Sequence, residues 1–144
     1  MKNILHKTGV ILLFMMVVAC SKTYDDVPND GKTIIGFTED LYIISVPQGE
    51  TSIDVEIEYL VSNTSPENRT FTVGVDADES TVSAENYTFN PSVSIPANQQ
   101  ITTFTFTAVD VSLTSSFEDL FLTFEDEEGI IVGKTTNLKI KTLN

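Results

Sequence analysis

The sequence predicts an all-β domain, built as an antiparallel sandwich of about seven strands. Short segments between residues 33 and 144 alternate apolar and polar side chains, which is typical of strands buried on one face only. Glycine, proline and asparagine separate these segments, as expected for tight turns. No stretch shows a sustained apolar period of 3.6 residues with capping residues at its ends, so we expect almost no helix.

Five segments show the alternation directly, and two more continuous apolar segments are consistent with further strands. The alternating segments are residues 53–59, 71–75, 104–108, 120–124 and 138–141, and the continuous ones are residues 34–37 and 41–46. Aromatic residues in the apolar phase are expected in the core, namely Tyr59, Phe71, Phe104, Phe106 and Phe124. The better candidates for exposed aromatic residues are Phe117 and Phe121, and Tyr24 and Tyr42 are further candidates.

Two turns and the last strand carry further expectations. Residues 96–98 (Pro-Ala-Asn) predict a turn with proline early and Asn98 in a left-handed conformation. Residues 127–129 (Glu-Glu-Gly) predict a hairpin between two apolar strands, because Gly129 tolerates a positive φ. Lys139 and Lys141 are expected on the outer face of the last strand, where they would discourage edge-to-edge pairing.

The N-terminal residues predict a secretory signal and not a membrane span. A basic start with Lys2 and Lys7 precedes an apolar run of about ten residues, 10–19, whereas a spanning helix needs about 20. The quartet that ends at Cys20 (Val-Val-Ala-Cys) resembles the lipobox of bacterial lipoproteins, in which the cysteine is acylated and becomes the first residue. The resemblance implies that residues 1–19 are a lipoprotein signal peptide and that lipid on Cys20 holds the protein at the outer membrane.

Residues 20–32 are expected to form a flexible linker between the lipid anchor and a domain formed by residues 33–144. The segment is polar, is short of large aliphatic side chains and contains Pro28 and Gly31. The acidic pair Asp25-Asp26 resembles the export signals that send lipoproteins of the Bacteroidetes group to the cell surface. A plain solvated linker fits the same composition, so surface-facing and periplasm-facing orientations both stay open.

Charge and composition exclude several classes of function. Cleavage before Cys20 would remove Lys2, Lys7 and the only histidine, leaving six basic residues against 21 acidic ones, a net charge of −15. Nucleic acid is therefore not an expected partner, because its phosphates would be repelled. A chain without histidine and without a free thiol cannot use Ser-His or Cys-His catalysis, and it lacks the ligands that zinc and copper sites favour.

Two segments resemble the central part of Calx-beta domains. Residues 86–110 contain a tyrosine strand, an Ile-Pro-Ala-Asn turn and a long alternating strand that ends at Asp110. Residues 117–124 are similar to the acidic and then apolar strand that follows in that family. Related immunoglobulin-like domains of Bacteroidetes surface lipoproteins share these elements. The resemblance implies an immunoglobulin-like β-sandwich that serves as an adhesion, carbohydrate-associated or spacer module.

The resemblance also implies a candidate calcium site, because several Calx-beta domains bind calcium through acidic loops at one end of the sandwich. Glu85, Asp110 and Glu118 fall near ligand positions of the family. The chain departs from the pattern where it has a single aspartate between two valines, and where Asn98 replaces the usual turn glycine. Calcium needs about 6–8 oxygen ligands, so the acidic side chains of residues 76–79 would have to contribute if they lie at the same end.

We expect a non-catalytic binding, adhesion or scaffold module of the cell envelope, with the membrane, an outer-membrane protein complex or a glycan as partner. A calcium-dependent adhesion domain is the alternative, and calcium is the one cofactor under consideration. A carboxylate-dependent glycosidase is the third hypothesis, and it would need two carboxylates about 5–9.5 Å apart across a concave site. The sequons at Asn63, Asn68 and Asn86 carry no expectation of glycosylation beside a bacterial lipobox.

Overall fold

The computed structural model describes residues 31–144, and Cys20, the signal peptide and most of the predicted linker lie outside this range. The described chain contains ten β-strands and one turn of 3-10 helix, η1. The elements are β1 (Thr33–Phe37), β2 (Leu41–Val46), β3 (Ser52–Val61), β4 (Arg69–Val75), η1 (Ala84–Asn86), β5 (Tyr87–Phe89), β6 (Ser92–Ile95), β7 (Ile101–Val109), β8 (Glu118–Phe124), β9 (Ile130–Val132) and β10 (Thr136–Thr142). Within these residues, no helix has the length and apolar character that crossing a membrane requires.

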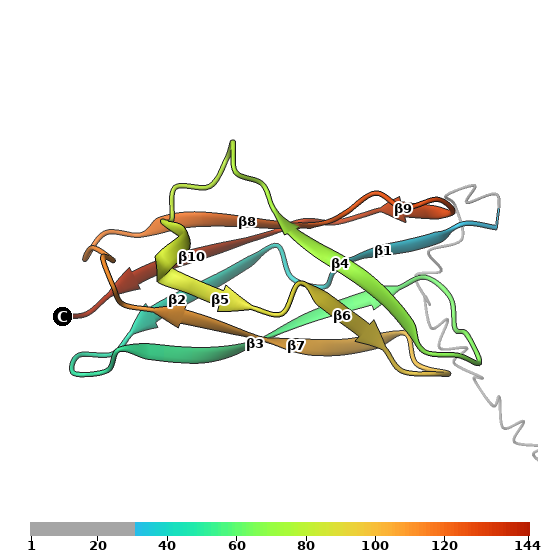
Figure 1. The fold of residues 1–144 in the computed structure, drawn as a ribbon, viewed down its shortest axis with the longest axis horizontal. Helices are drawn as coiled ribbons and strands as arrows, with labels where there is room; N and C mark the ends of the chain where they lie inside the picture. The colour runs from blue at the N-terminus through green and yellow to red at the C-terminus, as the bar shows by residue number, and fades with distance from the viewer. Residues whose placement is uncertain (1–30) are drawn as a thin grey trace, which may run out of the picture.

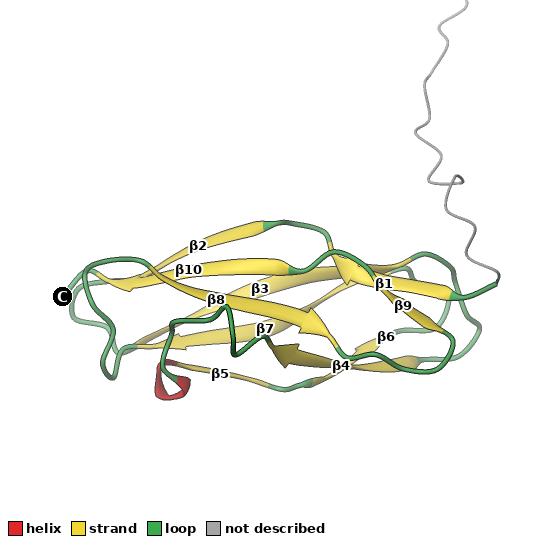
Figure 2. Ribbon diagram, turned by 90° about the horizontal axis from the view of Figure 1, so that it is seen from above, coloured by secondary structure: helices red, strands yellow, loops and turns green. Residues whose placement is uncertain are grey.

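The strands form two five-stranded sheets that pack face to face (Figures 1 and 2). One sheet has the order β5-β7-β3-β1-β9, and the other has the order β2-β10-β8-β4-β6. The predicted all-β sandwich is confirmed, and its seven expected strands correspond to β1, β2, β3, β4, β7, β8 and β10. The alternating pattern did not reveal β5, β6 and β9, because strands of three or four residues are too short to show it. β5 was expected only as the tyrosine strand of the Calx-beta resemblance, and β9 only as the apolar strand after the 127–129 turn.

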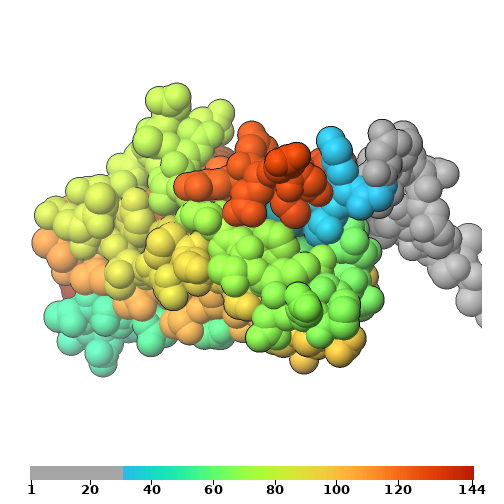
Figure 3. Space-filling model, turned by 45° about the vertical axis from the view of Figure 1, so that its right-hand side comes forward, coloured from blue at the N-terminus to red at the C-terminus, as the bar shows by residue number. Residues whose placement is uncertain are grey.

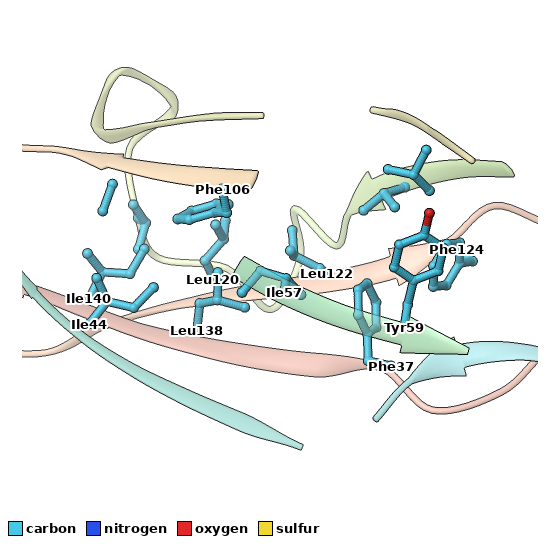
Figure 4. Packing of buried hydrophobic residues seen from close by; sticks show 14 of the residues in the cluster. Phe37, Ile44, Ile57, Tyr59, Phe106, Leu120, Leu122, Phe124, Leu138 and Ile140 are labelled. Carbon is cyan, nitrogen blue, oxygen red and sulfur yellow. The ribbon is translucent and has the colours of Figure 1, made fainter. Parts of the chain in front are cut away.

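The core lies between the sheets and is made by the apolar phase of the alternating strands. Ile57 and Tyr59 of β3 are buried, while the acidic residues next to them are exposed on the outer face. Aromatic rings pack on one another within the core, where the ring centroid of Phe124 lies 4.9 Å from that of Phe37 and 5.6 Å from that of Tyr59 (Figure 4). The aromatic residues predicted for the core are buried except for Phe104, which is half-buried and packs against the others.

The N-terminal part of the domain switches from one sheet to the other. β1 pairs antiparallel with β3 and parallel with β9, whereas β2 pairs parallel with β10 in the second sheet. The β9 segment therefore lies directly beside β1 (Figure 3). The backbones approach closely at Gly36, where an added Cβ would lie 2.7 Å from the backbone N of Lys134. Only glycine fits this contact. The parallel pairs could not be predicted from the sequence, because parallel and antiparallel strands show the same alternation of apolar and polar residues.

The two predicted turns have different outcomes. Asn98 has a φ of 63°, and Gln99 N donates to Pro96 O at 3.1 Å, so the turn predicted there is confirmed. The hairpin predicted around Gly129 is wrong. Gly129 does adopt a left-handed φ of 82°, but the strands on either side of it, β8 and β9, belong to different sheets. The turn reverses the chain while β9 crosses over to pair with β1.

The edge-protection role predicted for Lys139 and Lys141 is also wrong, because β10 lies inside its sheet between β2 and β8. Lys139 Nζ forms a salt bridge with Asp119 Oδ1 on β8 at 2.7 Å. Asn137 Nδ2 donates to the same oxygen at 2.7 Å. These hydrogen bonds, that of Lys139 first, lower the pKa of Asp119. Lys139 therefore balances a carboxylate within the sheet.

Candidate functional site

We define the tip as the end of the sandwich that carries the C-terminus, opposite the end at which residue 31 begins (Figures 1 and 2). The tip contains the 47–51 turn, η1, the 110–117 loop and residues 142–144. Hydrogen bonds connect these segments, since Asp110 N donates to Thr51 O at 2.8 Å and Thr142 N donates to Thr114 O at 3.0 Å. Four stretches that are distant in the sequence therefore form one connected surface.

Asn86 holds the 110–117 loop against η1. Its side chain is 0% exposed. The Oδ1 atom accepts hydrogen bonds from Val111 N at 3.2 Å and Ser112 N at 2.9 Å, while Nδ2 donates to Ser112 Oγ at 3.0 Å. A buried amide with both ends engaged is a structural group, so the sequon at this position is closed off in the folded protein. Sequence reasoning missed this role, and the only signal was a polar residue directly before an apolar strand.

Asp110, one of the three predicted metal ligands, joins the end of β7 to the C-terminus. Its Oδ2 atom accepts hydrogen bonds from Thr142 Oγ1 at 2.6 Å and from Asn144 Nδ2. Asn144 Oδ1 in turn accepts a hydrogen bond from Gly49 N at 2.8 Å, which extends the connection to the 47–51 turn. The carboxylate of Asp110 therefore serves as an acceptor that fixes the last residues of the described chain.

Glu85 and Glu118, the other two predicted ligands, also lie at or beside the tip, but each binds a different part of the 110–117 loop. Glu85 Oε1 accepts a hydrogen bond from Ser112 Oγ at 2.6 Å. Glu118 Oε1 accepts hydrogen bonds from the backbone N and the Oγ1 of Thr114, both at 3.2 Å. The structure thus brings the three carboxylates to the same end of the sandwich, and there they position loops.

These carboxylates do not assemble a calcium site in this arrangement. Within residues 31–144, no three His, Cys, Asp or Glu side chains are grouped so that they could hold a metal ion. The Oδ1 atom of Asp76 accepts the N–H groups of Asp78 at 3.1 Å and Glu79 at 3.4 Å, within a loop that stands out from the surface (Figures 1 and 3). Calcium needs about 6–8 oxygen ligands, and a site at the tip would need ligands besides these carboxylates. The metal-ligand role of the three tip carboxylates stays a prediction from the sequence.

The tip also carries an exposed aromatic ring beside a cation. Phe117 is 42% exposed, which agrees with its predicted exposure, and Lys141 Nζ lies 4.5 Å from the centroid of its ring. The apolar side chains of Val111 and Leu143 are exposed in the neighbouring tip segments. Tyr24 lies outside the described residues. The other two candidates, Phe121 and Tyr42, are half-buried, and Tyr42 Oη accepts a hydrogen bond from the backbone N of Glu58.

The outer face of β3 and β7 is the second polar surface and bears on the glycosidase hypothesis. Glu56 accepts hydrogen bonds from Thr103 Oγ1 and Thr105 Oγ1, both at 2.7 Å, and Asp54 accepts one from Thr107 Oγ1 at 2.6 Å. The hydroxyls of Thr105 and then Thr103 lower the pKa of Glu56. A glycosidase general acid needs a raised pKa, so this pairing of carboxylates and threonines does not fit that role.

Solved structures share this sandwich. A Bacteroides ovatus protein of unknown function matches with a TM-score of 0.63 and 17% identity, over 82% of this chain and 47% of its own. The apo form of the Calx CBD1 domain matches with a TM-score of 0.57 and 11% identity, over 78% of this chain and 99% of that domain. A proposed carbohydrate-binding protein of Bacteroides ovatus matches with a TM-score of 0.60 and 11% identity, over 76% of this chain and 37% of its own. At these identities the likeness establishes the fold, which is that of Calx-beta-like sandwiches.

No protein-family model matches the chain, and no curated protein matches it. The chain spans about half the length of the first three Bacteroides ovatus structures that it matches, between 45% and 47% of each. The resemblance to Calx-beta and related Bacteroidetes domains, which was inferred from residues 86–110 and 117–124, is therefore confirmed at the level of the fold.

Proposed function

We propose that this chain is a non-catalytic binding module of the bacterial cell envelope, held at the outer membrane by lipid on Cys20. The binding role is supported by the fold, which recurs in a proposed carbohydrate-binding protein and in Calx domains described as calcium-binding. The anchor is supported by the short apolar run and the lipobox-like quartet at residues 17–20. Two or more acyl chains give stable attachment, so a folded domain of this size needs no further membrane contact.

The observation that carries the proposal is the exposed ring and cation at the tip. Phe117 is 42% exposed with Lys141 Nζ above its ring, and Lys141 forms no salt bridge within the described residues of a chain that has 21 acids. An anchor attached before residue 31 would lie at the opposite end of the sandwich and would leave the tip free. A ring beside a lysine suits a sugar that packs on the ring and accepts a hydrogen bond from the ammonium group, and because the chain is strongly acidic we take neutral glycans as the ligand class.

Binding of acidic and neutral oligosaccharides to residues 31–144, measured on a glycan array and then by calorimetry, tests this proposal. We expect binding to neutral glycans that falls at least tenfold in Phe117→Ala and in Lys141→Ala, where a tenfold change corresponds to about 1.4 kcal/mol. Lys139→Ala is the matched control, because Lys139 is already paired with Asp119. Retained affinity in both tip variants, or no glycan binding by the parent domain, would contradict the proposed role of the tip.

The anchor is tested separately on the full chain in a bacterial host that processes lipoproteins. We expect the N-terminal peptide of the mature protein to begin at Cys20 and to carry acyl chains by mass spectrometry. Cys20→Ala should abolish acylation, whereas Ser21→Ala next to it should leave acylation intact. A mature protein without lipid, or one cleaved elsewhere, would remove the anchor from the proposal and leave the binding test unaffected.

A calcium-dependent adhesion domain is the second candidate function. It is favoured by one observation, that Glu85, Asp110 and Glu118 lie at the same end of the sandwich. Thermal unfolding with millimolar calcium and with a chelator tests it, since a ligand at about 100 times its Kd stabilises a protein by about 2.7 kcal/mol. An unchanged melting temperature, with magnesium as the control ion, would exclude this candidate. A rise that disappears in Glu118→Gln would support it.

A further inference from the structure

The four edge strands of the two sheets differ in how well they are protected against pairing with another chain. The edges are β5 and β9 in one sheet and β2 and β6 in the other. β5 and β9 have three residues each and β6 has four, and very short edge strands are one of the ordinary ways to avoid edge-to-edge pairing. β2 has six residues, and it contains no proline and no charged side chain. It is the one edge among the described strands without such protection.

The hydrogen bonds at the ends of β2 show which of its backbone groups are free. Asp40 O accepts a hydrogen bond from Asn137 N, and Val46 O accepts one from Leu143 N, both at 3.0 Å. In a parallel ladder every second residue faces the partner strand, so the even-numbered residues of β2 bond to β10. The N–H and C=O groups of the three odd-numbered residues, 41, 43 and 45, therefore point to the open side, where no described strand lies (Figure 2).

The side chains of the same three residues lie on the outer face of the sheet. Ile43 is 66% exposed and Leu41 is 45% exposed, while Ile44 and Val46 point into the core. Two large apolar side chains thus stand next to a row of unpaired backbone groups. An exposed edge of this kind is a template for a further strand.

We propose that β2 is the strand through which two copies of this chain pair, antiparallel and about a two-fold axis at Ile43. This alignment places Ile43 opposite Ile43 of the second copy and Leu41 opposite Ser45. All three outward-facing residues then form hydrogen-bonded pairs, giving about six backbone hydrogen bonds and one continuous ten-stranded sheet. The apolar side chains of the two copies come together on one face, as cross-strand pairs do.

The charges around β2 favour a second copy over another partner. Exposed Glu39 precedes the strand, and Lys141 of β10 lies beside Ser45 near its end. An antiparallel two-fold arrangement turns the acidic start of each β2 toward the lysine-bearing end of the other. On the outer face, β2 and β10 together present three uncharged residues, Asn137 and two lysines, so the strongly acidic chain can approach its copy here without carboxylates facing one another.

The contact is expected to be weak in dilute solution. Stable protein interfaces bury about 1,200–2,000 Å² in total, and one pair of six-residue strands buries less. Pairing should therefore depend on protein concentration.

Thiol crosslinking tests the proposal on residues 31–144, a segment that contains all ten strands and no cysteine. The twenty buried apolar side chains of the described chain lie between residues 35 and 140, so the segment has its own complete core. In the proposed pairing the two Cα atoms at position 43 lie about 5.5 Å apart. We expect Ile43→Cys to give several-fold more dimer with a short bis-maleimide than Ser94→Cys, an exposed position on edge strand β6 of the same sheet.

Two further experiments check the register and the edge. A mixture of Leu41→Cys and Ser45→Cys chains should crosslink with each other more than either does with itself, because these positions face one another across the axis. Ile43→Lys should keep the fold, since the side chain is exposed, and should abolish the concentration-dependent dimer in sedimentation. Dimer yields equal to that of the Ser94→Cys control in every cysteine variant would overturn the proposal. So would equal crosslinking of Ile43→Cys chains and of Ser45→Cys chains, each with its own copy.

Discussion

In the body of the sandwich, side chains from the two sheets contact one another, whereas at the tip single polar side chains form hydrogen bonds with the backbone and side chains of neighbouring loops. Phe124 of one sheet packs on Phe37 and Tyr59 of the other, with ring centroids 4.9 and 5.6 Å away. At the tip, Asn86 and Asp110 perform the equivalent task with hydrogen bonds to Val111, Ser112 and the C-terminal residues. The body therefore depends on buried apolar area, and the tip depends on a few donors and acceptors.

The difference shows how this fold can vary its loops without losing its core. Loss of one tip contact is expected to loosen one part of one loop, because each of Glu85 and Glu118 bonds to a single residue of the 110–117 loop. Loss of a central ring is felt by both sheets at once, since close-packed interiors relax only in part. Binding surfaces made of loops on a rigid scaffold are common for this reason.

The largest effect is expected from removing the ring of Phe124. Phe124→Ala should lower the free energy of unfolding by about 3–5 kcal/mol, because it leaves a cavity among three aromatic rings. Urea unfolding followed by circular dichroism measures this change. Phe117→Ala, which truncates the exposed ring at the tip, is the matched control and should cost about 1 kcal/mol or less. Similar losses in the two variants would show that the body and the tip are not stabilised differently.

The body was largely predictable from the sequence, because burial on one face of a strand leaves an alternating record. Residues 53–59 and 120–124 have this record and form the centres of β3 and β8. What the record cannot show is which strands meet. The parallel pairing of β2 with β10 and the crossing of β9 to the other sheet leave no mark in the alternation, and the crossing of β9 places the backbone of Lys134 close to Gly36.

The tip was predictable only in part. The resemblance to Calx-beta domains correctly directed attention to residues 85, 110 and 118, which the structure brings to one end of the sandwich. It did not reveal that each carboxylate fixes a loop, nor that Asn86 is the buried centre of the tip. A hydrogen bond between one side chain and the backbone of a distant segment produces no repeating pattern in the sequence. The role of Asn86 could therefore not be predicted from the order of polar and apolar residues.

A smaller loss of stability is expected from a substitution at Asn86, which tests directly whether the tip can be destabilised without the body. Asn86→Ala should lower the free energy of unfolding by about 1–3 kcal/mol, because two backbone N–H donors lose their buried acceptor. Hydrogen exchange resolves where the loss falls. The amides of Val111 and Ser112 should lose protection, while those of Ile57 and Leu138 in the sheets should keep it.

Asn90→Ala is the control for this change, since Asn90 is exposed and its Oδ1 accepts a hydrogen bond from Ser92 N within its own turn. The control should change stability by no more than about 0.5 kcal/mol and should leave the 110–117 loop protected. Equal loss of protection across the sheets in Asn86→Ala would mean that the tip and the body unfold as one unit.

The smallest expected effect concerns a polar contact on the outer face of the body, the pair formed by Asp119 and Lys139. Hydrogen bonds from Lys139 and Asn137 lower the pKa of Asp119 from its ordinary value of 3.8, so the folded state holds this carboxylate ionised more strongly than the unfolded state does. The stabilisation is present above pH 3.8 and is lost as the pH falls through the lower pKa of the folded state. For a partly exposed ion pair the stabilisation is expected to be about 1 kcal/mol or less.

Urea unfolding of the parent domain and of Asp119→Asn between pH 6 and pH 2 measures this contribution. We expect a constant difference in unfolding free energy above about pH 5, which shrinks toward zero as Asp119 becomes protonated in both states of the parent. Asp126→Asn, an exposed acid beside the 127–129 turn with no hydrogen bond in the described structure, is the control and should show no such trend. A difference in unfolding free energy that stays constant down to pH 2 would show that the charge of Asp119 does not stabilise the fold. The asparagine of the variant would then be destabilising because of its geometry alone.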